Sequence, residues 1–293
     1  MKLTALRGVG VALVTPFQSD GRVDYNALER VIEHVIAGGV QNLVTLGTTG
    51  ETPTLTAEEK IAIVRFTLEK TRNRIPVIVG IGGNNTKEII HLLETYPLSD
   101  AAAVLSVSPY YSKPSAEGLY QHYKAIAAAS PKPIILYNVP GRTGRNIPAS
   151  VVLRLAREVE NIAAVKEASG DMVQCMEILQ NKPADFTVVS GDDLLTLPQI
   201  ACGMEGVISV AGNFFAREMT DLVNHALAHR FDDARRIHYR LMEAFDYLFQ
   251  ENNPAGIKSF MAASGLLDEH LRLPVVPVSA ALQQKIRLFL KQY

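Results

Sequence analysis

Short apolar runs recur along the chain, each followed by a polar or glycine-rich loop and then by a segment of helical periodicity. The runs are rich in Val and Ile and do not alternate with polar residues, which is typical of parallel strands covered on both faces. Eight such runs occur, at residues 9–14, 42–46, 76–81, 101–107, 133–137, 162–165, 186–189 and 206–210.

Amphipathic segments separate these runs, for example residues 25–37, 57–70, 117–129 and 149–158. Two carry helix-start signals: Thr56 precedes Ala57-Glu58-Glu59 in the pattern of a capping box, and Pro148 stands at a first-turn position. Strand and helix alternating eight times predict an α/β fold, a (β/α)8 TIM barrel over residues 1–228.

The pattern changes after residue 228. Three helical stretches follow, at residues 231–251, 254–264 and 278–291, and the intervening residues 273–278 carry two prolines and are expected to form an extended linker. We therefore expect a C-terminal helical domain at residues 229–293.

Composition and charge bear on which classes of partner, metal and substrate the protein has. The formal net charge of the 293 residues is −1, and no run of Lys or Arg indicates nucleic acid or an anionic membrane as a partner. No His or Cys pattern has metal-ligand spacing, so neither a metal nor a cofactor is expected. Cys175 and Cys202 are expected to be buried, reduced thiols on helix faces. The first residues resemble neither a signal peptide nor a membrane span, which favours a cytoplasmic enzyme with small substrates.

Polar motifs follow most of the predicted strands. In a TIM barrel, catalytic groups gather at the carboxyl ends of the strands and in the loops that follow them. The motifs are Gly47-Thr48-Thr49-Gly50-Glu51, Gly82-Gly83-Asn84-Asn85, Pro109-Tyr110-Tyr111, Tyr137-Asn138-Val139-Pro140-Gly141-Arg142-Thr143-Gly144, Lys166-Glu167-Ala168-Ser169 and Ser190-Gly191-Asp192-Asp193.

Lys166 is the most informative single residue. It follows directly on the apolar run at 162–165, whereas the other eleven lysines are expected in loops, at termini or on polar helix faces. Burial favours the neutral, nucleophilic form of an amine, and such an amine attacks a carbonyl to form an imine that serves as an electron sink. An ion pair with Glu167 or a neighbouring carboxylate at the barrel rim explains the position equally well.

Tyr137 ends the neighbouring fifth strand, so its phenol is placed to exchange protons with a Lys166 imine, with Thr48 and Tyr111 as a relay. Taken singly, each of these residues is also explained as a core or rim residue with a satisfied hydroxyl. Thr48 and Thr49 lie between glycines before a helix, where backbone N–H groups and hydroxyls can bind a carboxylate.

Two further polar groups need an interpretation. Arg142 lies in a glycine-rich loop and can bind a second carboxylate bidentately, although a lone loop arginine is often only solvated. Asp192 and Asp193 are expected to cap the following helix and to have no catalytic role.

Five of these motifs together resemble the dihydrodipicolinate synthase family: those at 47–51, 109–111, 137–144, 165–168 and 190–193. They occur in the family's order over essentially the whole chain, including the helical tail. The resemblance implies a Schiff-base-forming synthase that condenses pyruvate with L-aspartate 4-semialdehyde to 4-hydroxy-tetrahydrodipicolinate, in lysine and diaminopimelate biosynthesis.

The resemblance also implies residue roles. Lys166 forms the pyruvate imine, Tyr137 acts as acid and base, and Thr48 completes the proton relay with a Tyr111 that reaches in from a neighbouring subunit. Thr49 and the backbone of Ile208 bind pyruvate, while Arg142 binds the semialdehyde carboxylate. The assembly implied is a homotetramer, a dimer of dimers.

The sequence differs from that of relatives that are inhibited by L-lysine. Regulated relatives bind lysine at the dimer interface among residues that match Asn84, Glu88 and Tyr110. They tend to carry His or Glu at the position of Lys60, and one regulated group often carries His at the position of Ala57. We therefore expect weak or absent inhibition.

Two alternatives remain open at this stage. Another pyruvate-dependent aldolase or lyase of the same superfamily, acting on N-acetylneuraminate or a keto-sugar acid, keeps the lysine and the tyrosine but usually lacks Arg142-Thr143-Gly144. A barrel that only binds a keto acid is disfavoured by the joint presence of Lys166, Tyr137, Thr48 and Tyr111.

Overall fold

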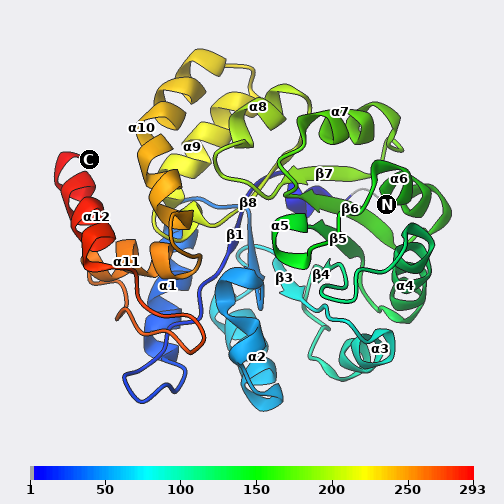
Figure 1. Cartoon of the computed structure of the whole chain (residues 1–293), viewed down its shortest axis with the longest axis horizontal. Helices are drawn as coiled ribbons and strands as arrows, with labels where there is room; N and C mark the ends of the chain where they lie inside the picture. Colours follow the sequence, from blue (N-terminus) through cyan, green and yellow to red (C-terminus); the bar gives the residue numbers. More distant parts are fainter. Residues whose placement is uncertain (1–2) are drawn as a thin grey trace.

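The computed structural model describes residues 3–293, so Met1 and Lys2 lie outside the described residues. Eight parallel strands pair in sequence order, and the eighth pairs with the first, which closes the sheet into a barrel (Figure 1). The strands are β1 Gly8–Ala12, β2 Asn42–Thr45, β3 Val77–Gly80, β4 Ala103–Val107, β5 Ile134–Asn138, β6 Ile162–Glu167, β7 Thr187–Ser190 and β8 Gly206–Ser209.

The TIM barrel and its eight expected strands are confirmed, with shifts at the strand ends. The largest shift that affects the site is in β6, which continues through Lys166 and Glu167 instead of ending before them. The ladder extends because Lys166 stays in register with Tyr137 on one side and Val189 on the other. Lys166 is therefore held on a strand and not on a loop.

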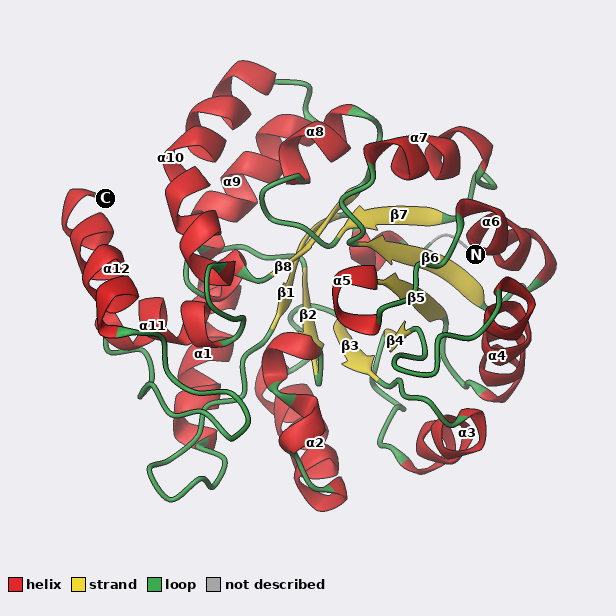
Figure 2. Cartoon of the chain, viewed as in Figure 1, coloured by secondary structure: helices red, strands yellow, loops and turns green. Residues whose placement is uncertain are grey.

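Helices surround the strands on the outside of the barrel (Figure 2). The capping box at Thr56 is confirmed, because its hydroxyl accepts from Glu59 N and the Glu59 carboxylate accepts from Thr56 N. Pro148 is the N-cap and precedes the first turn of its helix. The helices are α1 Tyr25–Ala37, α2 Ala57–Thr71, α3 Thr86–Thr95, α4 Ala116–Ala129, α5 Pro140–Thr143, α6 Ala149–Glu158, α7 Met172–Asn181, α8 Thr196–Ala201, α9 Ala216–Leu227, α10 Phe231–Phe249, α11 Ala255–Ala263 and α12 Ala280–Gln292.

Side chains alternate between two cores, because successive residues of a strand point to opposite faces. One core fills the barrel and includes Val44, Ile135, Ala164 and Ile208. The other lies between the strands and the surrounding helices and includes Leu136 and Val165. The position of a residue in this alternation decides whether its side chain reaches the barrel interior.

The C-terminal helices occur where the sequence predicts them, and residues 271–279 contain no strand. They pack on the barrel through an aromatic cluster in which Phe215, just before α9, contacts Phe260 of α11 and Tyr293 at ring-centroid distances of 5.5 and 5.4 Å. The domain division at residue 228 falls between α9 and α10 and stays a prediction. No helix within residues 3–293 is long and apolar enough to cross a membrane.

The expectation for the two cysteines is half wrong. Cys175 is buried on α7, and desolvation raises the pKa of its thiol to about 12. Cys202 is exposed at the end of α8, in the turn that leads to β8.

Candidate active site

Lys166 points into the barrel. It follows Ala164 by two positions on β6, and Ala164 belongs to the core inside the barrel, so the alternation of the strand places both side chains on the inner face. The residue is 4% exposed. No ion pair between Lys166 and a carboxylate occurs among the described residues, so the alternative in which a rim carboxylate neutralises this lysine is not supported.

Glu167 points the opposite way and has partners of its own. Its buried carboxylate accepts from Asn138 Nδ2 at 3.0 Å, from Gln174 Nε2 at 3.0 Å and from Ser169 N at 2.7 Å. These contacts hold the ends of β5 and β6 and the start of α7 together. An ion pair of Lys166 with its sequence neighbour is therefore wrong, because the strand separates the two side chains.

Tyr137 lies beside Lys166 on the inner face. The two residues are register partners on β5 and β6, and Lys166 Nζ lies 4.4 Å from the centroid of the Tyr137 ring. Tyr137 is 7% exposed. The Lys166 amine and the Tyr137 ring are therefore neighbours on the inner face, as the strand order predicts.

Gly191 makes room for the lysine. A Cβ at this position would lie 2.9 Å from Lys166 Cε and 2.6 Å from Ala168 Cβ, both closer than real Cβ contacts. The loop after β7 therefore needs glycine at 191 for the Lys166 side chain to keep its path into the cavity.

Two adjoining cavities of about 420 and 390 Å³ open at this end of the barrel. Volumes of this size suit small ligands. Lys166, Thr49, Gly191 and Val210 line the smaller cavity, and both cavities share the side chains of Thr48, Tyr137, Arg142 and Asn253.

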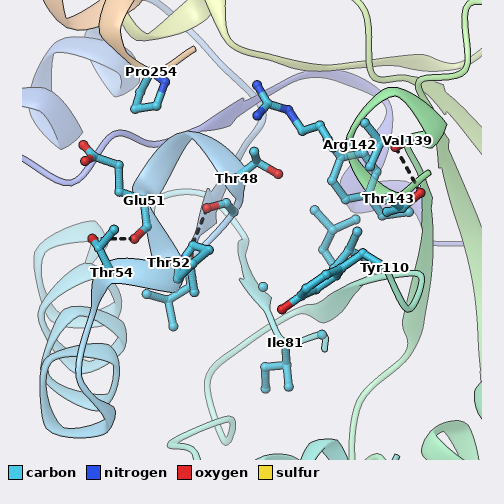
Figure 3. A pocket seen from close by; sticks show the side chains of 18 of the residues that line it. Thr48, Glu51, Thr52, Thr54, Ile81, Tyr110, Val139, Arg142, Thr143 and Pro254 are labelled. Carbon is cyan, nitrogen blue, oxygen red and sulfur yellow. Dashed lines mark hydrogen bonds between the residues drawn. The ribbon is translucent and has the colours of Figure 1, made fainter. Parts of the chain in front are cut away.

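The predicted carboxylate-binding segment forms two consecutive turns of 3-10 helix, Thr48–Gly50 and Thr52–Thr54, which we call the 47–54 loop. Thr15 Oγ1 donates to Gly50 O at 2.8 Å, and Thr52 Oγ1 donates to Gly47 O at 2.9 Å. Figure 3 shows Thr48 in the middle of the pocket wall, between Glu51 and Arg142.

Arg142 extends from α5 across the cavity mouth toward the segment that carries Pro254 (Figure 3). Its Nη2 donates to Asn253 O at 3.2 Å. Asn253 also donates from Nδ2 to Thr49 Oγ1 at 3.3 Å, and it is 4% exposed. Asn253 has no sequence signal that marks it as a site residue, since an Asn-Pro step after a long helix has the pattern of an ordinary turn.

Part of the cavity wall comes from the C-terminal extension. Phe245, Asp246, Phe249 and Gln250 of the α10 region line the smaller cavity together with Lys166. Sequence reasoning placed no site residue in this extension, because nothing in an amphipathic helical pattern says which barrel face the helix will cover.

Tyr111 does not reach the cavity of its own chain. It is 91% exposed and has a left-handed backbone with φ of 63°, which is uncommon for a bulky residue. Tyr110 is 41% exposed, lines the larger cavity and donates from its backbone N to Asn84 Oδ1 at 2.7 Å.

Ile208 is 1% exposed and belongs to the core inside the barrel, whereas Val210 is the residue of this segment that lines the smaller cavity. The backbone after β8 is held by Asp193, whose carboxylate accepts from Ser209 Oγ at 2.5 Å and from Ala211 N at 2.8 Å. Burial raises the pKa of Asp193. The prediction that Asp193 caps the next helix is wrong, whereas Asp192 Oδ1 does accept from Leu194 N and Leu195 N just before α8.

Two of the four residues matched to lysine regulation, Lys60 and Tyr110, line the larger cavity, and Asn84 and Glu88 are exposed. Lys60, on α2, lines this cavity together with Tyr96 and Tyr110. Glu88 stands exposed in the first turn of α3 and raises the pKa of Tyr96, after the larger effect of burial. Among residues 3–293, no cluster of three or more His, Cys, Asp or Glu side chains could hold a metal ion.

The chain is similar in sequence and in structure to known synthases. A 4-hydroxy-tetrahydrodipicolinate synthase of Parabacteroides distasonis is 51% identical over 287 residues, which is 98% of this chain and 97% of the relative. The dihydrodipicolinate synthase of Aquifex aeolicus superposes with a TM-score of 0.95 at 43% identity over 98% of both chains. A chloride-inhibited dihydrodipicolinate synthase of Acinetobacter baumannii, solved with pyruvate, gives a TM-score of 0.94 at 38% identity, again over 98% of both chains.

These relatives favour the synthase over an N-acetylneuraminate or keto-sugar-acid lyase. The dihydrodipicolinate synthetase family matches residues 5–293. The 4-hydroxy-tetrahydrodipicolinate synthases among these relatives condense pyruvate with L-aspartate 4-semialdehyde to 4-hydroxy-tetrahydrodipicolinate, on the route to diaminopimelate and lysine. The chain belongs to the dihydrodipicolinate synthetase family and is an enzyme with that activity.

Proposed function

We propose that Lys166 carries the reaction as a Schiff base. Its amine adds to the ketone carbon of pyruvate, and loss of water leaves a protonated imine. The imine draws electrons from the methyl group, which loses a proton, and the resulting enamine attacks the aldehyde carbon of the semialdehyde. The observation that carries this proposal is a buried amine inside the barrel, beside Tyr137 and without a carboxylate partner among the described residues.

Tyr137 supplies and removes the protons of these steps. Its position beside Lys166 Nζ puts the phenol next to the atom at which the carbinolamine forms and loses water. Thr48 lines the same cavities and relays the proton from Tyr137. Tyr111 of a neighbouring subunit completes the relay.

The two substrate carboxylates have separate binding groups. Thr49 and the backbone at Ile208 hold the carboxylate of pyruvate, a ligand for which the pyruvate-bound relative from Acinetobacter baumannii is the precedent. Arg142 holds the carboxylate of the semialdehyde, because its exposed guanidinium stands at the mouth of the cavity and not at its floor.

The working assembly is a homotetramer built from two dimers. Tyr111 supports this, since a bulky side chain that is 91% exposed and held in a left-handed conformation is suited to enter a neighbouring subunit. The cytoplasmic location stays a prediction from the sequence.

Asn84, Glu88, Tyr110 and Lys60 form the position at which L-lysine would bind. Lys60 stands in the same cavity as Tyr110, where its ammonium opposes the ε-ammonium of the ligand. The enzyme is therefore weakly inhibited by lysine, or not at all.

Reductive trapping tests the central proposal. Pyruvate followed by borohydride should add covalently to Lys166, because only an imine gives a reducible adduct at an amine, and Lys166→Ala should abolish the adduct. In Tyr137→Phe the adduct should form at the same lysine, but about 10²–10⁴-fold more slowly. An adduct that maps to another lysine, such as Lys258, would contradict the proposal.

A further inference from the structure

A buried ion pair joins the 47–54 loop to the C-terminal extension. Lys258, on α11, is 0% exposed, and its Nζ donates to Glu51 Oε1 at 2.6 Å and to His270 O at 2.9 Å. The other carboxylate oxygen of Glu51 accepts from Arg272 N at 3.1 Å. Both oxygens of Glu51 are thus held by groups more than 200 positions further along the chain.

Glu51 is also the residue at which the 47–54 loop changes direction. Its backbone is left-handed, with φ of 52° and ψ of 34°, a conformation that non-glycine residues keep only where their surroundings fix it. Its N donates to Thr48 O at 3.2 Å, and its carbonyl oxygen accepts from Thr54 N at 2.9 Å. The turn that carries Thr48 and Thr49 thus ends at the residue whose carboxylate is held by the C-terminal extension.

Stability alone is a poor explanation for such a pair. Desolvating two charges can exceed their mutual attraction, and well-packed apolar side chains often serve a core as well or better. The groups that hold the Glu51 carboxylate have further partners. Lys258 Nζ and Arg272 Cζ each lie 4.4 Å from the centroid of the Phe17 ring, and Arg272 donates to both oxygens of Glu59 on α2. These contacts hold Lys258 and Arg272, and with them the Glu51 carboxylate, in one position.

We propose that Lys258 is a positioning residue for the synthase reaction, which holds Glu51 and thereby keeps Thr48 and Thr49 in the geometry that binds pyruvate. Asn253, in the turn before α11, adds the contact of its Nδ2 with Thr49 Oγ1, so the extension contacts the 47–54 loop at two residues. This inference rests on the roles proposed above for Thr48 and Thr49.

The test uses the full-length enzyme and the double variant Lys258→Met/Glu51→Gln, which removes both charges and leaves no unpaired ion in the core. The number of active sites that form the borohydride-reduced pyruvate adduct is measured at saturating pyruvate. The steady-state rate is then divided by this number of reactive sites. We expect the pyruvate KM to rise by up to about 100-fold, since a shift of about 1 Å in a positioning group has effects of that size. Glu51→Gln alone should raise the pyruvate KM in the same direction, and it provides a second measurement if the double variant does not fold.

Two control variants distinguish the possible causes of a raised pyruvate KM. Lys182→Met removes another mostly buried lysine, one that donates to Phe186 O at 2.7 Å at the opposite end of the barrel, and should leave the pyruvate KM unchanged. Thr49→Val should raise the pyruvate KM with Lys258 intact. If Thr49→Val has no effect, the proposed pyruvate site is wrong.

If Thr49→Val raises the pyruvate KM while the folded double variant and Glu51→Gln keep wild-type KM and kcat per reactive site, the positioning role of Lys258 is refuted. A fall in the number of reactive sites with unchanged KM would refute it as well, because that is the result of a purely structural pair.

Discussion

Lys166 and Lys258 are the two buried lysines among residues 3–293, and their surroundings differ in the one respect that decides reactivity. Lys166 stands on a strand inside the barrel, next to a tyrosine ring and with no carboxylate partner among the described residues. Lys258 stands on a helix against a carboxylate oxygen 2.6 Å away. A carboxylate partner favours the charged ammonium over the neutral amine that attacks a carbonyl, whereas the same pairing suits an amine that holds a loop in place.

The fold itself produces this difference. A strand sends Lys166 and Glu167 to opposite faces, so the nearest carboxylate in sequence is occupied by Asn138 and Gln174 outside the barrel. On α11 no strand lies between Lys258 and a carboxylate, and the Lys258 amine contacts Glu51, which is distant in sequence. Methionine, close to lysine in shape and without charge, is therefore an informative substitution at both positions.

Lys166→Met should give the largest effect, a fall in kcat per enzyme on the order of 10⁴-fold or more, because the covalent step is lost. Its free energy of unfolding should stay within about 1 kcal/mol of wild type or rise, since the substitution removes a buried amine that has no carboxylate partner within residues 3–293. Steady-state assay and urea unfolding measure the two quantities. A strong loss of stability would mean that Lys166 has a structural partner and that the comparison fails.

Lys258→Met should reverse this pattern and lower the free energy of unfolding by about 3–5 kcal/mol, because Glu51 is left as an unpaired buried charge. Adding Glu51→Gln should restore most of the loss. Urea unfolding of wild type, both single variants and the double variant completes a double-mutant cycle. Effects of the two substitutions that simply add would show that the two side chains do not interact.

A smaller effect should appear with pH. Burial lowers the pKa of Lys258 to about 8, an effect that Glu51 opposes only in part. The folded chain therefore releases this proton at a lower pH than the unfolded chain does, so the free energy of unfolding rises with pH between the two pKa values, about 8 folded and about 10.5 unfolded. Lys258→Met/Glu51→Gln lacks the group. The difference in unfolding free energy between wild type and this variant should therefore grow from pH 8 to pH 10, and a constant difference would contradict the assignment.

Lys60 extends the comparison to a lysine that is half-buried and lines the larger cavity. Its ammonium should weaken the binding of free L-lysine by about 1 kcal/mol or more, so inhibition should be weak or absent. Lys60→His should increase inhibition, measured by titration of the steady-state rate with L-lysine. Strong cooperative inhibition of the wild type would show that Asn84, Glu88 and Tyr110 outweigh Lys60.

The barrel could be predicted because eight apolar runs recur with the spacing of a βα unit, and Lys166 and Tyr137 could be found because strand order makes them neighbours. Lys258 was missed, although a signal exists. The segment Ala255–Ala263 is apolar on nearly all its faces, and a helix of that kind is buried, together with any lysine that it carries.

Other parts of the site have no local signal. Asn253 and the α10 residues line the cavity only because the extension folds back over the barrel mouth, and Asp193 holds the β8 end through contacts 16 to 18 positions away. Such contacts depend on how elements pack in three dimensions. The periodicity of apolar residues along the chain therefore does not predict them.

The separation of 207 positions between Glu51 and Lys258 also has a consequence for the order of synthesis. A ribosome completes the 47–54 loop and all eight strands before it makes α11, so the Glu51 carboxylate stays hydrated while the rest of the barrel is already present. If Lys166 and Lys258 have the roles proposed above, a chain that ends after β8 would carry Lys166 on its strand but lack the contact that holds the 47–54 loop. We therefore expect the nascent enzyme to bind pyruvate productively only after α11 has been made and has packed on the barrel.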